Sequence, residues 1–88
     1  MTTYRLTIAT PNGKVYDGQA TCLTLRGAEG DLAILGGHAP FVTSVLPCRV
    51  SVDIDDETQF FGRVDGGLLT VGGAVVTLLT SSFVKEEE

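Results

Sequence analysis

Closely spaced turn signals dominate this sequence and limit what it can fold into. Glycines, prolines and paired acidic residues interrupt the chain roughly every six to ten residues. These breaks lie at Asn12-Gly13, Gly18, Gly27, Gly30, Gly36-Gly37, Pro47, Asp55-Asp56, Gly66-Gly67 and Gly72-Gly73. The residues between them are rich in Thr, Val, Ile, Leu and Tyr, which suit a pleated, half-buried surface. No window carries a long helical period free of breakers, so the spacing predicts an all-β fold.

Alternating polar and apolar residues between the breaks indicate half-buried strands. Residues 49–54, Arg-Val-Ser-Val-Asp-Ile, are the clearest case. Asn12-Gly13, Asp55-Asp56 and Gly72-Gly73 each separate two such runs, and we expect a hairpin at each. Short strands at this spacing are typical of a β-sandwich or a β-barrel, and 88 residues suffice for one core.

Two apolar runs, residues 68–71 and 74–79, alternate less clearly than the others. Such runs suit strands that are covered on both faces, by the core on one side and by a partner or a neighbouring element on the other. We therefore expect one of the sheets to have an outer face that something else covers.

The C-terminal residues, SSFVKEEE, hold too few apolar positions to pack as a helix. Chain ends of this kind fray unless they are tied down. We therefore expect a sandwich domain over residues 1–83, followed by an acidic flexible tail over residues 84–88.

The charge balance excludes several partners. The net charge is −5, and Arg26, Arg49 and Arg63 stand singly in the sequence, which argues against nucleic acid and anionic lipid. The acidic residues at 53–57 are typical of a solvated turn. The N-terminus resembles no leader peptide and no apolar stretch approaches about 20 residues, so we expect no membrane insertion.

The reactive side chains form no recognisable site. His38 is the only histidine, and Cys22 and Cys48 belong to no Cys-x-x-Cys motif, whereas a structural zinc site needs about four ligands. There is no Gly-x-Ser-x-Gly motif, and neither Gly36-Gly37 nor Gly66-Gly67 continues into a P-loop. We expect free thiols, no metal, no cofactor and no catalytic residue.

The residues alone leave three functions open. Pro40 restricts the loop around His38, and a rigid loop presents contacts at low entropic cost, which favours recognition of another protein. A free-standing β-sandwich that binds a small ligand or a protein partner is the second possibility, although the aromatic residues are not grouped. A small hydrolase that uses His38 is the third, and it predicts a perturbed pKa for that histidine.

Four segments of the sequence help to choose among these three functions. They are TIATPNGKVYDG, GAEGDLAILGGHAPFVTSVLP, DGGLLTV and VVTLLT. In this order and at this spacing they resemble the N-terminal β-sandwich domain of the epsilon subunit of F-type ATP synthases. The resemblance extends from residue 4 to about residue 80.

The resemblance implies a flattened sandwich of two roughly five-stranded sheets. It implies a non-catalytic rotor subunit in the central stalk, which binds the gamma subunit and rests on the ring of c subunits, so that ion transport is coupled to ATP synthesis. It also implies a peripheral location on the cytoplasmic face of the bacterial plasma membrane. A chain that presents such a face to partners is expected to be able to dimerise in isolation.

The resemblance also assigns residues to the two interfaces. It places at the end of the sandwich that meets the c-ring the residues Glu29, Gly30, Asp31, His38, Ala39 and Pro40. It places on or near the side that faces gamma the residues Thr10, Val42 and Thr43. Charges at such a rim set register and association rate more than affinity.

The chain departs from the family pattern in three ways. Gly36 stands where proline is usual before Gly-His-Ala-Pro, and Asp65 stands where serine is usual before Gly-Gly. Family members commonly continue into a C-terminal helical hairpin that can inhibit ATP hydrolysis or bind ATP, and this sequence stops at Glu88. We expect no helical domain here, whether the sequence is a naturally short form or a piece of a longer one.

Overall fold

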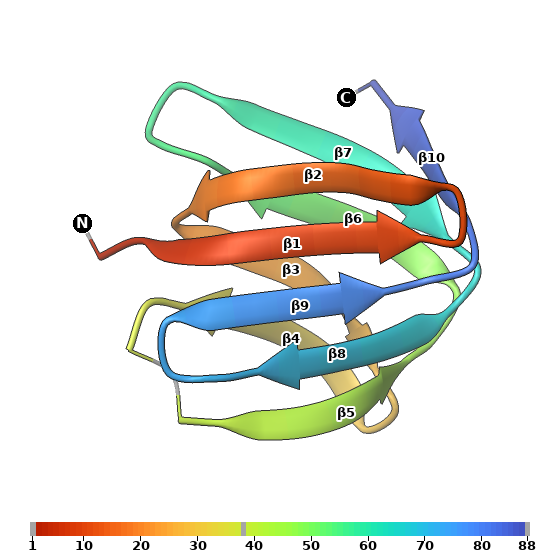
Figure 1. Cartoon of the computed structure of the whole chain (residues 1–88), viewed down its shortest axis with the longest axis horizontal. Coiled ribbons are helices and arrows are strands. Elements are labelled where there is room, and N and C mark those ends of the chain that lie inside the picture. The colour runs from red at the N-terminus through yellow and green to blue at the C-terminus, as the bar shows by residue number, and fades with distance from the viewer. Residues whose placement is uncertain (1, 38, 88) are drawn as a thin grey trace.

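The structure, a computed structural model of the whole chain, describes residues 2–37 and 39–87. Ten strands account for most of it and are drawn in Figure 1. They are β1 (Tyr4–Thr10), β2 (Gly13–Ala20), β3 (Cys22–Gly27), β4 (Gly30–Leu35), β5 (Phe41–Val45), β6 (Cys48–Asp53), β7 (Gln59–Val64), β8 (Gly67–Val71), β9 (Val75–Leu79) and β10 (Phe83–Glu86). The all-β prediction is confirmed.

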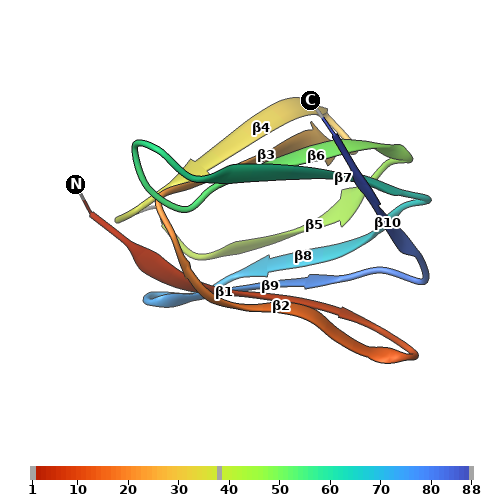
Figure 2. The same cartoon turned by 90° about the horizontal axis from the view of Figure 1, so that it is seen from above.

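The strands form two layers, which Figure 2 shows from above. One five-stranded sheet has the order β4–β3–β6–β7–β10, and the other has the order β5–β8–β9–β1–β2. All neighbours are antiparallel except β1 and β9, which are parallel. The two sheets meet at a corner, where Gly27 of β3 pairs with Val45 of β5. This is the sandwich of two five-stranded sheets that the resemblance implies.

The corner depends on a glycine. A Cβ at Gly27 would lie 2.8 Å from Cδ1 of Leu32, so a larger residue would collide with the neighbouring strand. Gly27 also pairs with Gly30 across the β3–β4 hairpin. The missing side chain therefore lets β3 contact both β4 and β5 at the same point.

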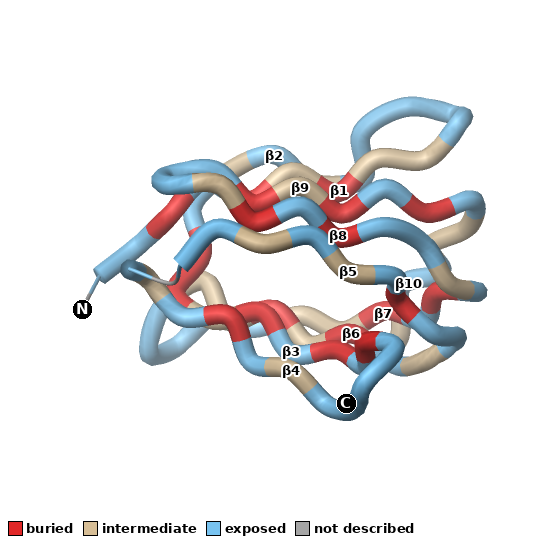
Figure 3. The backbone as a smooth tube through the Cα atoms, turned by 90° about the horizontal axis from the view of Figure 1, so that it is seen from below, coloured by how far each residue is buried: buried red, intermediate tan, exposed pale blue. Residues whose placement is uncertain are grey.

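The core fills the space between the layers, as the buried segments in Figure 3 show. Alternate residues of nearly every strand contribute, so that Val50 and Val52 of β6 are fully buried while Arg49 is exposed. Tyr4 of β1 spans the core, and its hydroxyl donates a 2.7 Å hydrogen bond to the carbonyl oxygen of Ile34 in the opposite sheet. This bond satisfies a buried phenol and joins the two layers.

The three expected hairpins are present as β1–β2, β6–β7 and β8–β9. Gly13 adopts a φ of 125°, which explains the glycine after Asn12. In the β6–β7 turn, Oδ1 of Asp55 accepts hydrogen bonds of 2.8 Å from the backbone N–H groups of Glu57 and Thr58. The acidic cluster around residue 55 thus contributes to the turn itself. Both cysteines are free, as expected.

The predicted tail begins too early. Residues 83–86 form β10, which pairs with β7 from Phe83 opposite Val64 to Glu86 opposite Phe61. The ring of Phe83 packs directly over Gly62, where a Cβ would collide with it. The prediction counted apolar side chains for a helix, whereas β10 is held by backbone pairing, one ring and ion pairs.

Candidate partner-binding surface

The predicted c-ring residues Glu29, Gly30 and Asp31 lie at the tip of the β3–β4 hairpin. Gly30 has a φ of 132°, so the turn requires a residue that tolerates this conformation. Glu29 is exposed. Asp31 accepts a 2.9 Å hydrogen bond from Nε of Arg26, and this bond raises the pKa of the guanidinium. The tip therefore presents one free carboxylate and one that is paired.

Ala39 and Pro40 lie at the other end of β4, and the expectation that they share one end of the sandwich with Glu29 and Asp31 is wrong. The strand between the two turns is fully extended and crosses the molecule (Figure 1). At about 3.3 Å per residue, its two ends are roughly 17 Å apart. His38 lies outside the described residues, so its predicted role stays a prediction.

The predicted gamma residues are divided between two faces. Val42 and Thr43 are neighbours in β5, and side chains of adjacent strand residues point to opposite faces. Val42 pairs with exposed Thr70 and points outward, whereas Thr43 pairs with fully buried Leu69 and points inward. Thr10 ends β1, where its hydroxyl accepts a hydrogen bond from the N–H of Asn12.

Val42 belongs to a larger surface that we call the apolar face. It comprises the outward side chains of β5, β8 and β9, of which four large ones are exposed: Val42 (62%), Leu68 (41%), Val75 (47%) and Leu79 (48%). Between them lies a cross-strand row of threonines, since Thr70 pairs with Thr77 and Thr77 with Thr7 of β1. These three strands contain no charged residue. Such a patch is typical of a protein interface.

The sequence predicted part of this surface. The weakly alternating runs at 68–71 and 74–79 indicated strands with two apolar faces, and Leu68, Val75 and Leu79 are their outward members. Sequence reasoning did not connect those runs with Val42, because the pairing of β5 with β8 joins segments that are far apart in the chain. The absence of charge in β5, β8 and β9 was the available signal.

The opposite outer face is charged, and it gathers arginines that stand apart in the sequence. Arg49 pairs across strands with Arg63, and the backbone N–H of Arg26 lies 3.4 Å from Sγ of Cys48 beside them. Nε atoms of Arg49 and Arg63 lie 3.3 and 3.1 Å from the two carboxylate oxygens of Glu86. We call this surface, with Arg26 and its partner Asp31, the charged face. Its cations are already paired within the chain.

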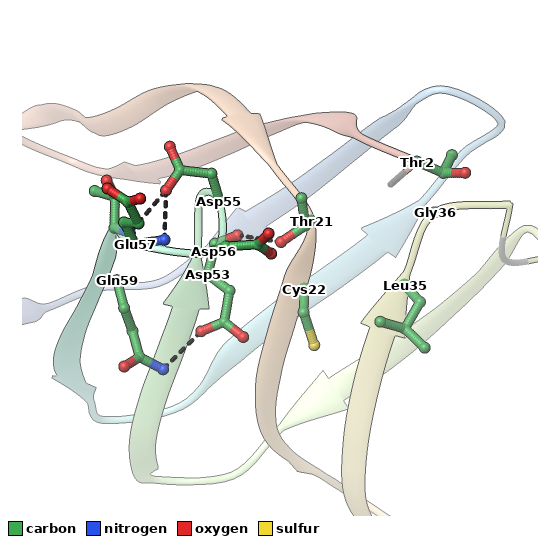
Figure 4. A pocket seen from close by; sticks show the side chains of 11 residues that line it. Thr2, Thr21, Cys22, Leu35, Gly36, Asp53, Asp55, Asp56, Glu57 and Gln59 are labelled. Atoms are coloured by element: carbon green, nitrogen blue, oxygen red, sulfur yellow. Dashed lines mark hydrogen bonds between the residues drawn. The ribbon is translucent and has the colours of Figure 1, made fainter.

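A third surface is the hollow drawn in Figure 4, of about 670 Å³, at the end of the sandwich that carries the β6–β7 turn. Asp53, Asp55, Asp56 and Glu57 contribute to its lining. Gln59 donates a 2.7 Å hydrogen bond to Asp53, and the backbone bonds to Asp55 lower the pKa of that carboxyl. Among residues 2–37 and 39–87, no group of three or more His, Cys, Asp or Glu side chains is arranged to hold a metal ion.

The family model for the β-sandwich domain of the ATP synthase delta/epsilon chain matches residues 3–86. The chain belongs to this family. It is 36% identical to the ATP synthase epsilon chain of Acinetobacter baylyi over 87 residues and 34% identical to that of Acinetobacter baumannii. In both cases the alignment covers 99% of this chain and 63% of the relative, so the chain spans less than two thirds of those proteins.

Chains in solved structures of two mitochondrial ATP synthases share the fold. One is a chain of the mitochondrial ATP synthase of Euglena gracilis, with a TM-score of 0.89 and 22% identity over 97% of this chain and 54% of that one. Another belongs to the central stalk and c-ring structure of the Tetrahymena thermophila mitochondrial enzyme, with a TM-score of 0.78 and 14% identity over 91% and 64%. In the described part of this chain, no helix is long and apolar enough to span a bilayer.

Proposed function

We propose that this chain acts as the sandwich of a non-catalytic rotor subunit in an F-type ATP synthase, where it links the gamma subunit to the c-ring. The observation that carries this proposal is the family match over residues 3–86, together with relatives that are ATP synthase epsilon chains. In this role the chain couples ion-driven rotation to ATP synthesis without chemistry of its own. It is peripheral, on the cytoplasmic face of the bacterial plasma membrane.

The apolar face is the proposed gamma-binding surface. It combines four exposed Val and Leu side chains with neutral threonines, and covering them would remove apolar area from water at about 25 cal/mol per Å². Val42 lies on this face and stays assigned to gamma, while Thr10 is at its border, at the end of β1. Thr43 points inward from the same strand, so its assignment to gamma requires contact at the edge of β5 that faces away from β8.

The tip of the β3–β4 hairpin is the proposed c-ring contact. Glu29 and Asp31 present carboxylates there to the basic or amide groups of a polar loop. Ala39 and Pro40 follow the other end of β4, a strand that is roughly 17 Å long. Since those two residues lead directly into β5 and Val42, we assign them to the border of the gamma surface instead.

Co-purification with the gamma subunit from the same source tests the proposal. We expect a stable complex with gamma, and a larger one when the c-ring is added. Sedimentation of the free chain is measured first, because a dimer formed through the apolar face would compete with gamma. A folded, monomeric chain that shows no affinity for gamma would contradict the proposal.

A second experiment separates the two interfaces. Replacing both Glu29 and Asp31 by Ala is expected to lower ATP synthesis by reassembled membranes while leaving gamma binding and the fold intact, because both residues lie at an exposed turn. Unchanged proton-driven ATP synthesis would show that the hairpin tip does not bear on the c-ring.

A further inference from the structure

A groove of about 830 Å³ opens at one end of the apolar face. It lies where the β1–β2 turn, the β7–β8 turn and the segment after β9 come together. Its apolar lining includes Ala9, Leu68 and Leu79, and its polar lining includes Asp65 and Ser81. The volume is in the range of sites that hold a small molecule or an inserted side chain.

Among the residues that the structure describes, Asp65 is the one acidic residue that lines this groove. Oγ of Ser81 donates a 2.6 Å hydrogen bond to its carboxylate, and Oγ1 of Thr80 lies 3.4 Å from the other oxygen. The bond from Ser81 lowers the pKa of Asp65, so the side chain is charged at neutral pH. The hydroxyl of Thr80 donates a shorter bond of 2.6 Å to the carbonyl oxygen of Gly66, whereas the backbone N–H groups of Asp65 and Ser82 also bond to the carboxylate. A carboxylate offers about four acceptor positions, so Ser81 and these two N–H groups leave about one position open.

The carboxylate of Asp65 has no counter-ion in the described part of the chain. The arginines and Lys14 form ion pairs with Asp17, Asp31 and Glu86, and no ion pair includes Asp65. The two hydroxyl contacts tie the β7–β8 turn to the segment after β9, but a neutral acceptor would make the same link. The negative charge is therefore available to a group from outside.

The residues that line the groove indicate which kind of chemical group would bind there. Lysine and arginine place an aliphatic stem along apolar surface and keep the charged head at a polar site. Here Ala9, Leu68 and Leu79 would contact the stem, and the Asp65 carboxylate would accept from the head. Leu68 and Leu79 also belong to the apolar face, so a side chain in the groove comes from the protein that covers that face.

We propose that this groove receives a lysine or arginine side chain of the gamma subunit, with its stem against Leu68 and Leu79 and its cation on Asp65. This inference rests on the proposed function, which puts gamma on the apolar face. It adds a charged contact at the border of a surface whose own strands, β5, β8 and β9, contain no charged residue. Such a contact fixes the orientation of the two proteins and makes their affinity depend on salt.

The test compares two substitutions that remove one negative charge each. Asp65→Asn retains an acceptor for Ser81 and Thr80, and Asp56→Asn changes an exposed acid in the β6–β7 turn. Affinity for purified gamma is measured by calorimetry at low and high salt, and urea unfolding checks the fold. We expect Asp65→Asn to weaken gamma binding about tenfold and to flatten its salt dependence, and Asp56→Asn to change affinity less than twofold.

The partner residue is then sought on gamma by replacing its lysines and arginines singly with methionine. One of these variants is expected to lose affinity with the wild-type chain and to lose almost nothing further with Asp65→Asn. If Asp65→Asn does not fold, Asp65→Ser replaces it, because serine also keeps an acceptor.

The outcomes separate the two proposals. If the wild-type chain fails to bind gamma, the proposed function is wrong. If it binds, and Asp65→Asn binds equally well with the same salt dependence, only the groove assignment is wrong. An affinity loss that couples to no basic residue of gamma would also overturn the assignment, because the effect would then come from the link between the turns.

Discussion

The two outer faces of this sandwich are both built from short strands, but one exposes charged side chains and the other exposes apolar side chains. On the charged face, Glu86 accepts Arg49 and Arg63 together, and the Arg49 guanidinium lies 4.2 Å from the ring centre of Phe61. On the apolar face, Val42 and Leu79 have no such neighbours to cover them and remain about half exposed. The charged groups of one face are paired within the chain, whereas the apolar side chains of the other face remain exposed.

The difference has an energetic origin. Exposed ion pairs between neighbouring strands contribute little each, about 0–1 kcal/mol, but they leave no group that needs another protein. Exposed valine and leucine cost nothing further in the free chain, and they gain when a partner removes them from water. The outer face of one sheet of a sandwich can thus be stabilised by ion pairs within the chain, while the outer face of the other sheet favours binding to a partner, without any change in the core between them.

The largest expected effect is on the affinity for gamma, and two valines of nearly equal exposure test it. Val42 and Val84 lie on β5 and β10, the outer strands of the two sheets, and are 62% and 60% exposed. Val42→Glu is expected to weaken gamma binding about 100-fold, because the complex would bury an unpaired charge. Val84→Glu should leave that affinity within about twofold, and both should unfold within ~0.5 kcal/mol of wild type.

Calorimetry with purified gamma and urea unfolding check both variants. Equal losses of affinity for the two valines would remove the distinction between the faces. A loss confined to Val84→Glu would reverse it, and gamma would then belong on the charged face.

The second effect concerns how β10 is attached to β7, on the core side of the sheet that carries the charged face. Gly62 is buried under the ring of Phe83, so Gly62→Ala is expected to lower the free energy of unfolding by about 2 kcal/mol through overpacking. Gly73 of the β8–β9 turn is the matched control, because a Cβ there meets nothing within 4 Å. Urea unfolding should show no loss beyond ~0.5 kcal/mol for Gly73→Ala, and equal losses would mean that the contact under Phe83 is not what matters.

The smallest expected effect is on the free energy of unfolding, and it tests whether the ion pairs of the charged face serve the fold and not the binding of gamma. Glu86→Gln releases Arg49 and Arg63 and is expected to lower the free energy of unfolding by at most about 1 kcal/mol, since these groups are partly exposed. The loss should shrink in 1 M salt, where the Debye length is about 3 Å. Glu57→Gln, which breaks no ion pair of the described residues, serves as the control. A loss of gamma affinity in Glu86→Gln alone would show that the charged face also binds.

Local patterns predicted most of the fold. The alternation in residues 49–54 and the turn signals at Asn12-Gly13 and Gly72-Gly73 depend on neighbours in sequence, and the structure confirms all three. The same kind of signal failed at β10, because its strand is fixed by Phe83 over Gly62 and not by its own composition.

The surfaces depended on register, which a single sequence does not display. Arg49 and Arg63 stand singly in the chain, and only the pairing of β6 with β7 places them side by side. Val42 and Thr43 are adjacent in the chain, and the pleat sends them to opposite faces. Distances along the sequence were therefore a poor guide to which residues a partner would meet together.

The bond from Tyr4 to the Ile34 carbonyl also gives this chain its own optical reporter. The sequence has no tryptophan and only two tyrosines, and Tyr4 is buried while Tyr16 lies at the surface margin. Desolvation raises the pKa of the Tyr4 phenol, so the folded state favours its neutral form. The stability that this contributes is present below the unfolded pKa of about 10 and is lost as pH rises above it. Phenolate absorbance during an alkaline titration should therefore rise in two steps, and the second should coincide with the separation of the two sheets.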